Sequence, residues 1–191
     1  MLPQTTFDLD LNPPPFSEGL DDWSRSDGTP DSPTYEGMAG ARIIGSDPDF
    51  GSCLELRQML PMQRLRYMGE VPIRQGSCLE IIVRLKVLRP PLLRARIATW
   101  PGTAHGRGIQ DLPTTGPSAE TTALDEVLTL STIIGPASAE GVDLVWDSRA
   151  AYAHVGIDLQ GEVGGTVRIA DLRLRDVTRR IFGCERLLPG F

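Results

Sequence analysis

The strongest constraint on the fold is an alternation of apolar and polar side chains between residues 78 and 88. Five aliphatic residues occupy every second position: Leu79, Ile81, Val83, Leu85 and Val87. A period of two places such residues on one face of a β-strand, and Glu80, Arg84 and Lys86 fall on the other. Pro90-Pro91 ends the pattern because proline has a fixed φ and no backbone donor. The sequence therefore predicts a long strand over Cys78–Leu88 with one buried face.

Shorter alternations recur along the whole chain. They predict strands over Ala41–Gly45, Cys53–Met59, Gln63–Met68, Leu92–Trp100, Leu124–Ile134, Glu140–Asp147, Ala151–Leu159 and Thr166–Val177. In the last of these the apolar phase slips, which predicts a β-bulge near Ala170-Asp171. Ser24–Gly40 and Pro101–Ala123 carry turn residues and are predicted to be long loops. About nine short strands without an amphipathic helix indicate an all-β fold, an antiparallel β-sandwich with jelly-roll topology.

The N-terminal stretch from Asn12 to Trp23 joins a proline-rich entry to three large apolar side chains. The prolines at 13–15 exclude a helix or a central strand. Phe16, Leu20 and Trp23 are expected to close one end of the sandwich as a plug. The predicted organisation is an N-terminal arm over residues 1–15, a jelly-roll domain over 16–177 and a tail over 178–191.

Length and charge narrow the class of protein. A chain of 191 residues suits one domain, and a net charge of −6 argues against a nucleic-acid partner and against an anionic membrane surface. Residues 1–50 hold ten acidic side chains against two arginines, whereas residues 166–191 hold six arginines against three acids. These segments either pair, within or between subunits, or form two solvated surfaces.

The cysteines and the hydropathy pattern bear on compartment. Cys53, Cys78 and Cys184 are odd in number and lack a C-x-x-C spacing, so we expect free thiols rather than a disulfide framework or a zinc site. The N-terminus has no basic region followed by an apolar run, so no secretory signal is expected. No apolar run approaches the ~18 residues of a membrane span. We expect synthesis in the cytoplasm and no membrane partner.

The two ends of the chain resemble those of galactose-binding-like jelly rolls, the fold of many carbohydrate-binding modules. The resemblance lies in Asn12, Phe16, Gly19-Leu20 and Trp23 at the start, and in the closing strand Val167–Leu174. Pro72-Ile73 and Gly76, leading into the long strand, fit between them. Ala170 replaces the first Asp of a closing pair that helps bind a structural calcium in some relatives. No cofactor is therefore expected, with a structural calcium as the alternative that the resemblance leaves open.

A narrower resemblance is to a domain of phage-like spike proteins in bacteria that make gene transfer agents. It is carried by four segments: Pro13–Ser24, Asp27–Pro30, Asp49–Leu56 and Leu65–Glu70. Longer relatives continue into a β-helical, pectate-lyase-like region that does not follow Phe191 here. The resemblance implies the short form, the base of the head spike, which joins a spike fibre to the capsid. The spike helps the particle to attach to the capsular polysaccharide of recipient cells.

This resemblance implies partners and a location. The expected partners are a capsid protein, a spike fibre protein and further copies of this chain, arranged as a fivefold ring because a spike sits on a symmetric vertex. Residues 1–15 are expected to contact the capsid, and the tail after Val177 the fibre. The protein would be assembled on the surface of the particle and released from the cell with it.

Three aromatic residues are candidates for sugar stacking: Trp100, Trp146 and Tyr152. Packing in the core or at an interface is the alternative for each, since large aromatic side chains are often buried. Trp100 is the strongest candidate because it lies opposite the apolar face of its strand and borders a loop. These residues motivate a second interpretation, an autonomous carbohydrate-binding module.

Catalytic patterns are weak. The two histidines, His105 and His154, could serve a Ser-His-Asp site, with Asp158 four residues after His154, but no nucleophile-elbow sequence is present. Asp21-Asp22 and Asp8-x-Asp10 fit no calcium-loop spacing. We therefore expect a protein that is not an enzyme and holds no metal.

Overall fold

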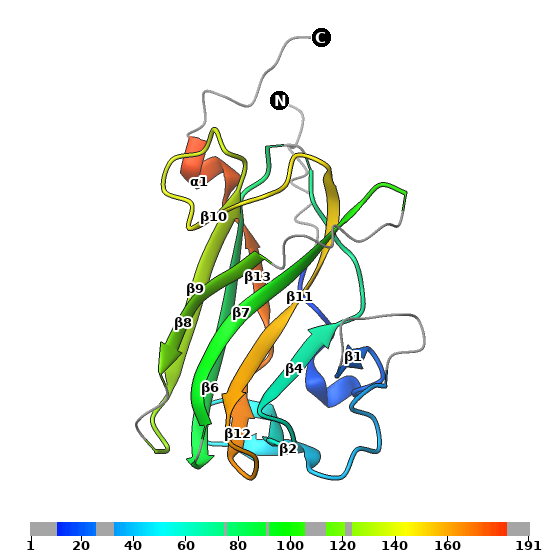
Figure 1. The fold of residues 1–191 in the computed structure, drawn as a ribbon, viewed down its shortest axis with the longest axis vertical. Helices are drawn as coiled ribbons and strands as arrows, with labels where there is room; N and C mark the ends of the chain where they lie inside the picture. The colour runs from blue at the N-terminus through cyan, green and yellow to red at the C-terminus, as the bar shows by residue number, and fades with distance from the viewer. Residues whose placement is uncertain are drawn as a thin grey trace, which may run out of the picture.

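Two β-sheets packed face to face form the structure, a computed structural model that describes residues 11–25, 33–74, 76–90, 92–105, 114–120 and 124–182 (Figure 1). The front sheet contains, in spatial order, β1 (Trp23–Ser24), β4 (Met62–Tyr67), β11 (Ala150–Gly161), β7 (Leu92–Thr103) and β8 (Thr114–Glu120), with β5 (Val71–Pro72) also on β11. The back sheet contains β10 (Leu144–Val145), β9 (Leu128–Gly135), β6 (Leu79–Arg89), β12 (Thr166–Ile169), β3 (Gly51–Arg57) and β2 (Ala41–Asp47), with β13 (Arg173–Asp176) also on β6. Two short helical segments, η1 (Phe16–Glu18) and α1 (Thr178–Phe182), complete the described elements. This is the predicted β-sandwich jelly roll.

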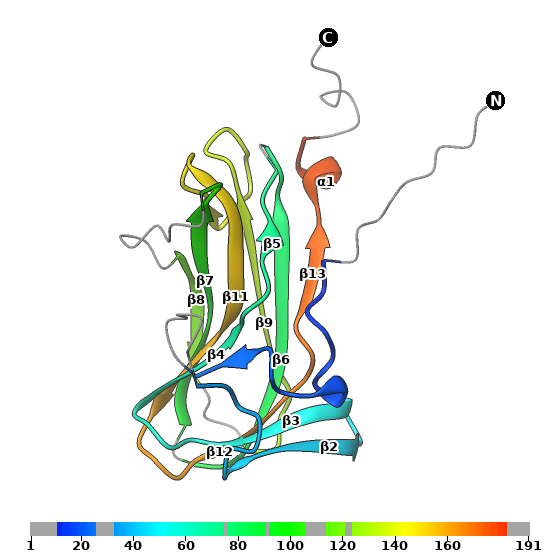
Figure 2. The same ribbon diagram turned by 90° about the vertical axis from the view of Figure 1, so that its right-hand side faces the viewer.

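The core lies between the two layers, which Figure 2 shows from the side. The apolar face of β6 is buried, as the alternation predicts. The front sheet buries a matching set of side chains against this face. Ile157 on β11 pairs in register with Leu65 on β4 and with Ile97 on β7, and all three side chains are fully buried. Burying one such side chain contributes about 1.5–3 kcal/mol. The period-two pattern is therefore confirmed in β6 and in β11, the central strands of the two sheets.

The N-terminal stretch closes the sandwich, as expected. Phe16 and Trp23 are fully buried, with ring centroids 4.7 Å apart. The Phe16 backbone N–H donates to Oδ1 of Asp171 at 2.9 Å, and the Leu174 N–H donates to Oδ1 of Asn12 at 2.7 Å. Two residues of the opening motif therefore bind the closing segment directly.

The predicted loop over Pro101–Ala123 is wrong in part. β7 continues to Thr103, and residues 114–120 form β8 at the edge of the front sheet. Gly116 and Pro117 lie together opposite Ile97, where the register of β7 and β8 shifts. An edge strand tolerates proline at a bulge, because the missing backbone donor breaks no ladder.

Two further strand predictions needed correction, and one bulge is confirmed. The stretch Glu140–Asp147 is strand only at β10, which runs parallel to β9, and β9 begins at Leu128 rather than Leu124. In contrast, β12 and β13 pair with β6 with one extra residue between Ile169 and Arg173, as the phase slip predicts. Residues 1–10 of the predicted N-terminal arm, and Cys184 in the predicted tail, lie outside the described residues. Cys53 and Cys78 are buried free thiols, and no described helix is long and apolar enough to cross a membrane.

Candidate functional site

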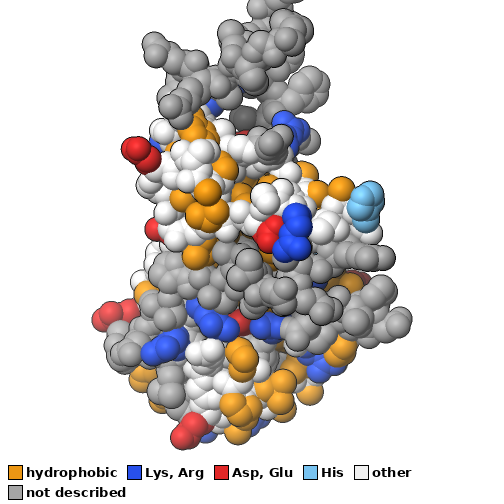
Figure 3. Space-filling model, turned by 45° about the horizontal axis from the view of Figure 1, so that its top comes forward, with side chains coloured by type: hydrophobic (Ala, Val, Ile, Leu, Met, Phe, Trp, Pro, Cys, Tyr) orange, Lys and Arg blue, Asp and Glu red, His pale blue; other side chains and the backbone are white. Residues whose placement is uncertain are grey.

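The outer face of the front sheet gathers aromatic and charged side chains from β4, β11 and β7. Because side chains alternate along a strand, the neighbours of the buried residues Leu65, Ile157 and Ile97 face outward. We call this surface the aromatic–arginine face. It comprises Arg64, Arg66, Arg96, Trp100, Tyr152, His154 and Asp158. Figure 3 shows basic side chains on either side of an acidic one in the lower part of this side of the molecule.

Asp158 holds two of the arginines together. It lies in register with Arg64 on one side and Arg96 on the other. Nε and Nη2 of Arg64 donate to its two carboxylate oxygens at 2.8 and 3.2 Å, and Nη2 of Arg96 donates at 3.1 Å. The Asp158 side chain is only 1% exposed, so both contacts are charge-assisted bonds shielded from water. They fix the two guanidinium groups at the centre of the face.

Trp100 lies beside these arginines. It is half-buried and stands opposite His154 in the pairing of β7 with β11. The guanidinium carbons of Arg64 and Arg66 lie 4.7 and 5.2 Å from the centre of its ring. Both distances are within the range of a cation–π interaction. The indole is therefore held in place by side chains that reach it from across β11.

Gly156 makes this meeting across β11 feasible. It pairs with Arg66 on β4 and with Ala98 on β7, so two of the three residues that lie side by side across these strands are small. A Cβ atom at Gly156 would lie 2.1 Å from the Leu65 carbonyl oxygen, which is a backbone atom. Glycine at this position permits a close approach of β4 and β11.

Tyr152 and His154 extend the face along β11. The Tyr152 ring packs on Gly102, where an added Cβ would lie 2.2 Å from the ring. The His154 ring meets Tyr152 edge-on at 5.5 Å, and its Nδ1 lies 3.1 Å from the Gly69 carbonyl oxygen. Burial, together with the charge of Arg66, lowers the pKa of His154. The lowered pKa favours the neutral ring, and a neutral ring with its proton on Nδ1 would donate to the Gly69 carbonyl.

Arg66 differs from the other arginines of this face. It is 5% exposed, and neither its Nε nor its Nη1 has a hydrogen-bond partner. Burial, reinforced by the charge of Arg64, lowers the pKa of Arg66 to about 10. The sequence pattern places Arg64 and Arg66 on the outward side of β4, but it gives no sign that Arg66 would be buried.

The three predicted stacking residues do not share one surface. Trp100 and Tyr152 both belong to the aromatic–arginine face. Trp146 is 7% exposed and is part of the hydrophobic core, as the packing alternative for this residue expects. His105 is exposed in the turn after β7, while His154 contacts a backbone carbonyl and Asp158 contacts arginines. In the described part of the chain, no group of three or more His, Cys, Asp or Glu could hold a metal ion.

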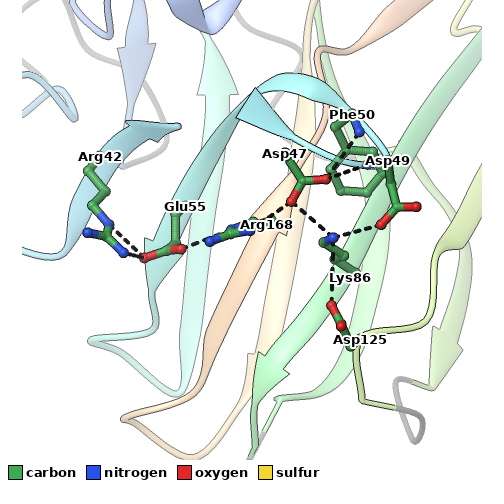
Figure 4. A network of polar contacts seen from close by, with 8 residues as sticks. All are labelled: Arg42, Asp47, Asp49, Phe50, Glu55, Lys86, Asp125 and Arg168. Atoms are coloured by element: carbon green, nitrogen blue, oxygen red, sulfur yellow. Dashed lines mark hydrogen bonds and ion pairs between the residues drawn. The ribbon is translucent and has the colours of Figure 1, made fainter. Parts of the chain in front are cut away.

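A second charged cluster covers the outer face of the back sheet (Figure 4). It runs from Arg42 through Glu55, Arg168 and Asp47 to Lys86, which also contacts Asp49 and Asp125. Burial alone would raise the pKa of Asp47, but hydrogen bonds from Arg168, Lys86 and the Asp49 backbone hold that pKa well below its usual range. The pKa of Lys86 is raised, chiefly by its hydrogen bond to Asp49. Each charge in this cluster has an opposite partner, which indicates a structural role.

No protein-family model matches the chain, and no curated protein matches it. Among solved structures, its fold is similar to the CBM22-1 xylan-binding domain of Paenibacillus barcinonensis Xyn10C, with a TM-score of 0.55 and 9% identity over 85% of this chain and 91% of that one. It is similar to TmCBM61, solved in complex with β-1,4-galactotriose, with a TM-score of 0.51 and 11% identity over 85% and 94% of the two chains.

A third similar structure is the enzymatically active domain of bacteriophage CBA120 tailspike protein 4, with a TM-score of 0.51 and 11% identity over 83% of this chain. The match spans only 20% of the tailspike chain. At such identities the likeness concerns the fold alone. The chain has the jelly-roll fold of carbohydrate-binding modules, and this fold also occurs in a phage tailspike.

Proposed function

We propose that the protein binds carbohydrate, without a catalytic step, through the aromatic–arginine face. One observation carries the proposal: Trp100 and Tyr152 present half-buried rings on an outward sheet surface among oriented polar groups. Rings of this kind offer an apolar surface to a sugar, and the neighbouring N–H donors can bind its hydroxyl groups. The jelly-roll likeness supports the proposal, although a fold alone does not imply a function.

A glycan array with the purified protein and two variants tests this proposal. Trp100→Ala should abolish the signal, because it removes the largest ring of the face. Phe50→Ala is the matched control, since Phe50 is a half-buried aromatic residue near Lys86 on the back sheet. Equal loss in both variants, or no binding by the wild type, would refute the proposal.

We further propose that this binding serves adhesion, with the protein as the base of the head spike of a phage-like gene transfer agent particle. The sequence resemblance of Pro13–Ser24 and Leu65–Glu70 supports this role, as does the likeness in fold to a tailspike domain. In this role the protein connects a spike fibre to the capsid and supports adsorption to capsular polysaccharide. Residues 1–15 would contact the capsid, and the tail after Val177 the fibre.

Electron microscopy of particles from a strain lacking this protein tests the particle role. Head spikes should be missing, and their persistence would overturn the proposal. The mass of the purified protein in solution tests the ring separately. A fivefold oligomer supports the spike base, whereas a monomer favours an autonomous carbohydrate-binding module.

A further inference from the structure

Arg66 carries a charge that the described part of the protein leaves unbalanced. The side chain is 5% exposed, and its Nε and Nη1 atoms are closed to water and have no acceptor. A buried polar group without a partner is costly, and a buried charge without one is costlier still. The hydrogen bonds between described residues therefore do not account for an arginine at this position.

The surroundings of Arg66 are basic. Arg64 and Arg96 share the single carboxylate of Asp158, so three guanidinium groups face one carboxylate among the described side chains of the face. Among the described side chains of this face, positive charge is therefore in excess, in a protein whose net charge is −6. On the back sheet the charges are matched, since Lys86 and Arg168 each contact two or more carboxylates. The imbalance belongs to the aromatic–arginine face.

The contact with Trp100 does not occupy the N–H donors of the Arg66 guanidinium group, so these donors can bind a planar anion. The guanidinium carbon lies 5.2 Å from the ring centre, so the ring contacts the guanidinium group without accepting a conventional hydrogen bond from it. A guanidinium group presents its N–H donors as a fork that matches the two oxygens of a carboxylate. We propose that Arg66 binds a carboxylate group of the glycan, so that the ligand is an acidic polysaccharide containing uronic acid or a similar carboxylated sugar.

This inference rests on the proposed carbohydrate-binding function and narrows its ligand to the acidic class. Since the Nε and Nη1 atoms are closed to water, a ligand reaches them only when neighbouring side chains move. Association is therefore slower than for an open site.

The experiment compares matched pairs of glycans on one array: uronic-acid oligosaccharides and their carboxyl-reduced, neutral counterparts. The wild type should bind the acidic member about 10- to 100-fold more tightly, as expected for one hydrogen-bonded charge pair. Arg66→Met should reduce this ratio to near one, because it weakens binding of the acidic member far more than binding of the neutral member. Arg66→Lys keeps the charge but loses the fork, so its ratio should lie between the two.

Two controls separate binding from structure. Arg89→Met removes an equal charge from an exposed position on the back sheet and should leave the ratio unchanged. The melting temperature of Arg66→Met should equal or exceed that of the wild type, because an unpaired buried charge is removed. A large fall in melting temperature would show that Arg66 is structural and would overturn the inference.

The outcomes distinguish the two proposals. Binding of neutral glycans with no preference for acidic ones overturns the role of Arg66 and leaves carbohydrate binding in place. Absence of binding to every glycan overturns both. A preference for acidic glycans that survives Arg66→Met overturns the assignment to this residue.

Discussion

Replacing Asp47 by Asn tests how the charged cluster of the back sheet stabilises the fold. The Asp47 side chain is fully buried, with Oδ2 3.0 Å from Nζ of Lys86 and 2.8 Å from Nη1 of Arg168. Its Oδ1 accepts the backbone N–H groups of Asp49 and Phe50. Asn can keep the latter bonds, but its amide group then turns N–H donors toward two cations.

The expected loss of stability depends on which ion pairs Lys86 and Arg168 keep after the substitution. Breaking a buried ion pair costs about 3–5 kcal/mol. Lys86 keeps Asp49 at 2.7 Å, and Arg168 keeps Glu55 at 3.0 Å, so we expect the lower limit, about 3 kcal/mol. For a domain of this size that corresponds to a fall in melting temperature of about 6–12 °C.

The three carboxylates around Lys86 differ in their exposure to solvent, and the two exposed ones provide the controls. The side chains of Asp47, Asp49 and Asp125 are 0%, 42% and 74% exposed. Solvent screens the last two, so Asp125→Asn should cost at most about 0.5 kcal/mol, and Asp49→Asn about 1 kcal/mol despite its shorter distance to Lys86. Urea unfolding followed by circular dichroism measures all three. Equal losses for Asp47→Asn and Asp49→Asn would refute the argument that burial, rather than distance, sets the cost.

Three further predictions follow from the geometry. Gly156→Ala should destabilise the protein by about 1–3 kcal/mol because its Cβ meets the Leu65 carbonyl, whereas Gly45→Ala, with no atom within 4 Å of the added Cβ, should be nearly neutral in thermal melts. Stability should fall as pH drops below about 4, since the unfolded chain protonates Asp47 at its ordinary pKa while the folded protein holds that pKa lower, and Asp47→Asn should flatten this part of the pH–stability curve. Stability should also fall above about pH 10.4, because Lys86 loses its proton more readily in the unfolded chain, and Lys86→Met should remove that part of the alkaline slope.

The sequence pattern predicted the strands that bury one face, but it did not predict the strands at the edges of the sheets, β8 and β10, correctly. β6 and β11 were readable because each sends alternate side chains into the core. β8 was not, since Gly116 and Pro117 are turn residues that an edge bulge accommodates. β10 lies inside the strand predicted over Glu140–Asp147 but is only two residues long, so there the pattern predicted too long a strand.

The candidate site was predictable only in part. Alternation placed Arg64, Arg66 and Trp100 on outward faces, and the structure agrees. Their meeting depends on β11 lying between β4 and β7, and Arg64 and Asp158 are 94 residues apart in the sequence. Nothing local fixes that register. Trp146 shows the opposite limit, since nothing in its local sequence distinguishes an aromatic residue that fills the core from one that lies on a binding surface.

The hydrogen bonds from Phe16 to Asp171 and from Leu174 to Asn12 also constrain the order of folding. They join partners 155 and 162 residues apart, so the sandwich cannot close until nearly the whole described chain has left the ribosome. Contacts of such long range slow folding and leave strand edges exposed in the meantime. Nascent chains truncated before Leu174 should therefore be open to proteases that the finished domain resists. A circular permutant, in which the two ends of the chain are joined and new ends are opened elsewhere, should fold without that delay.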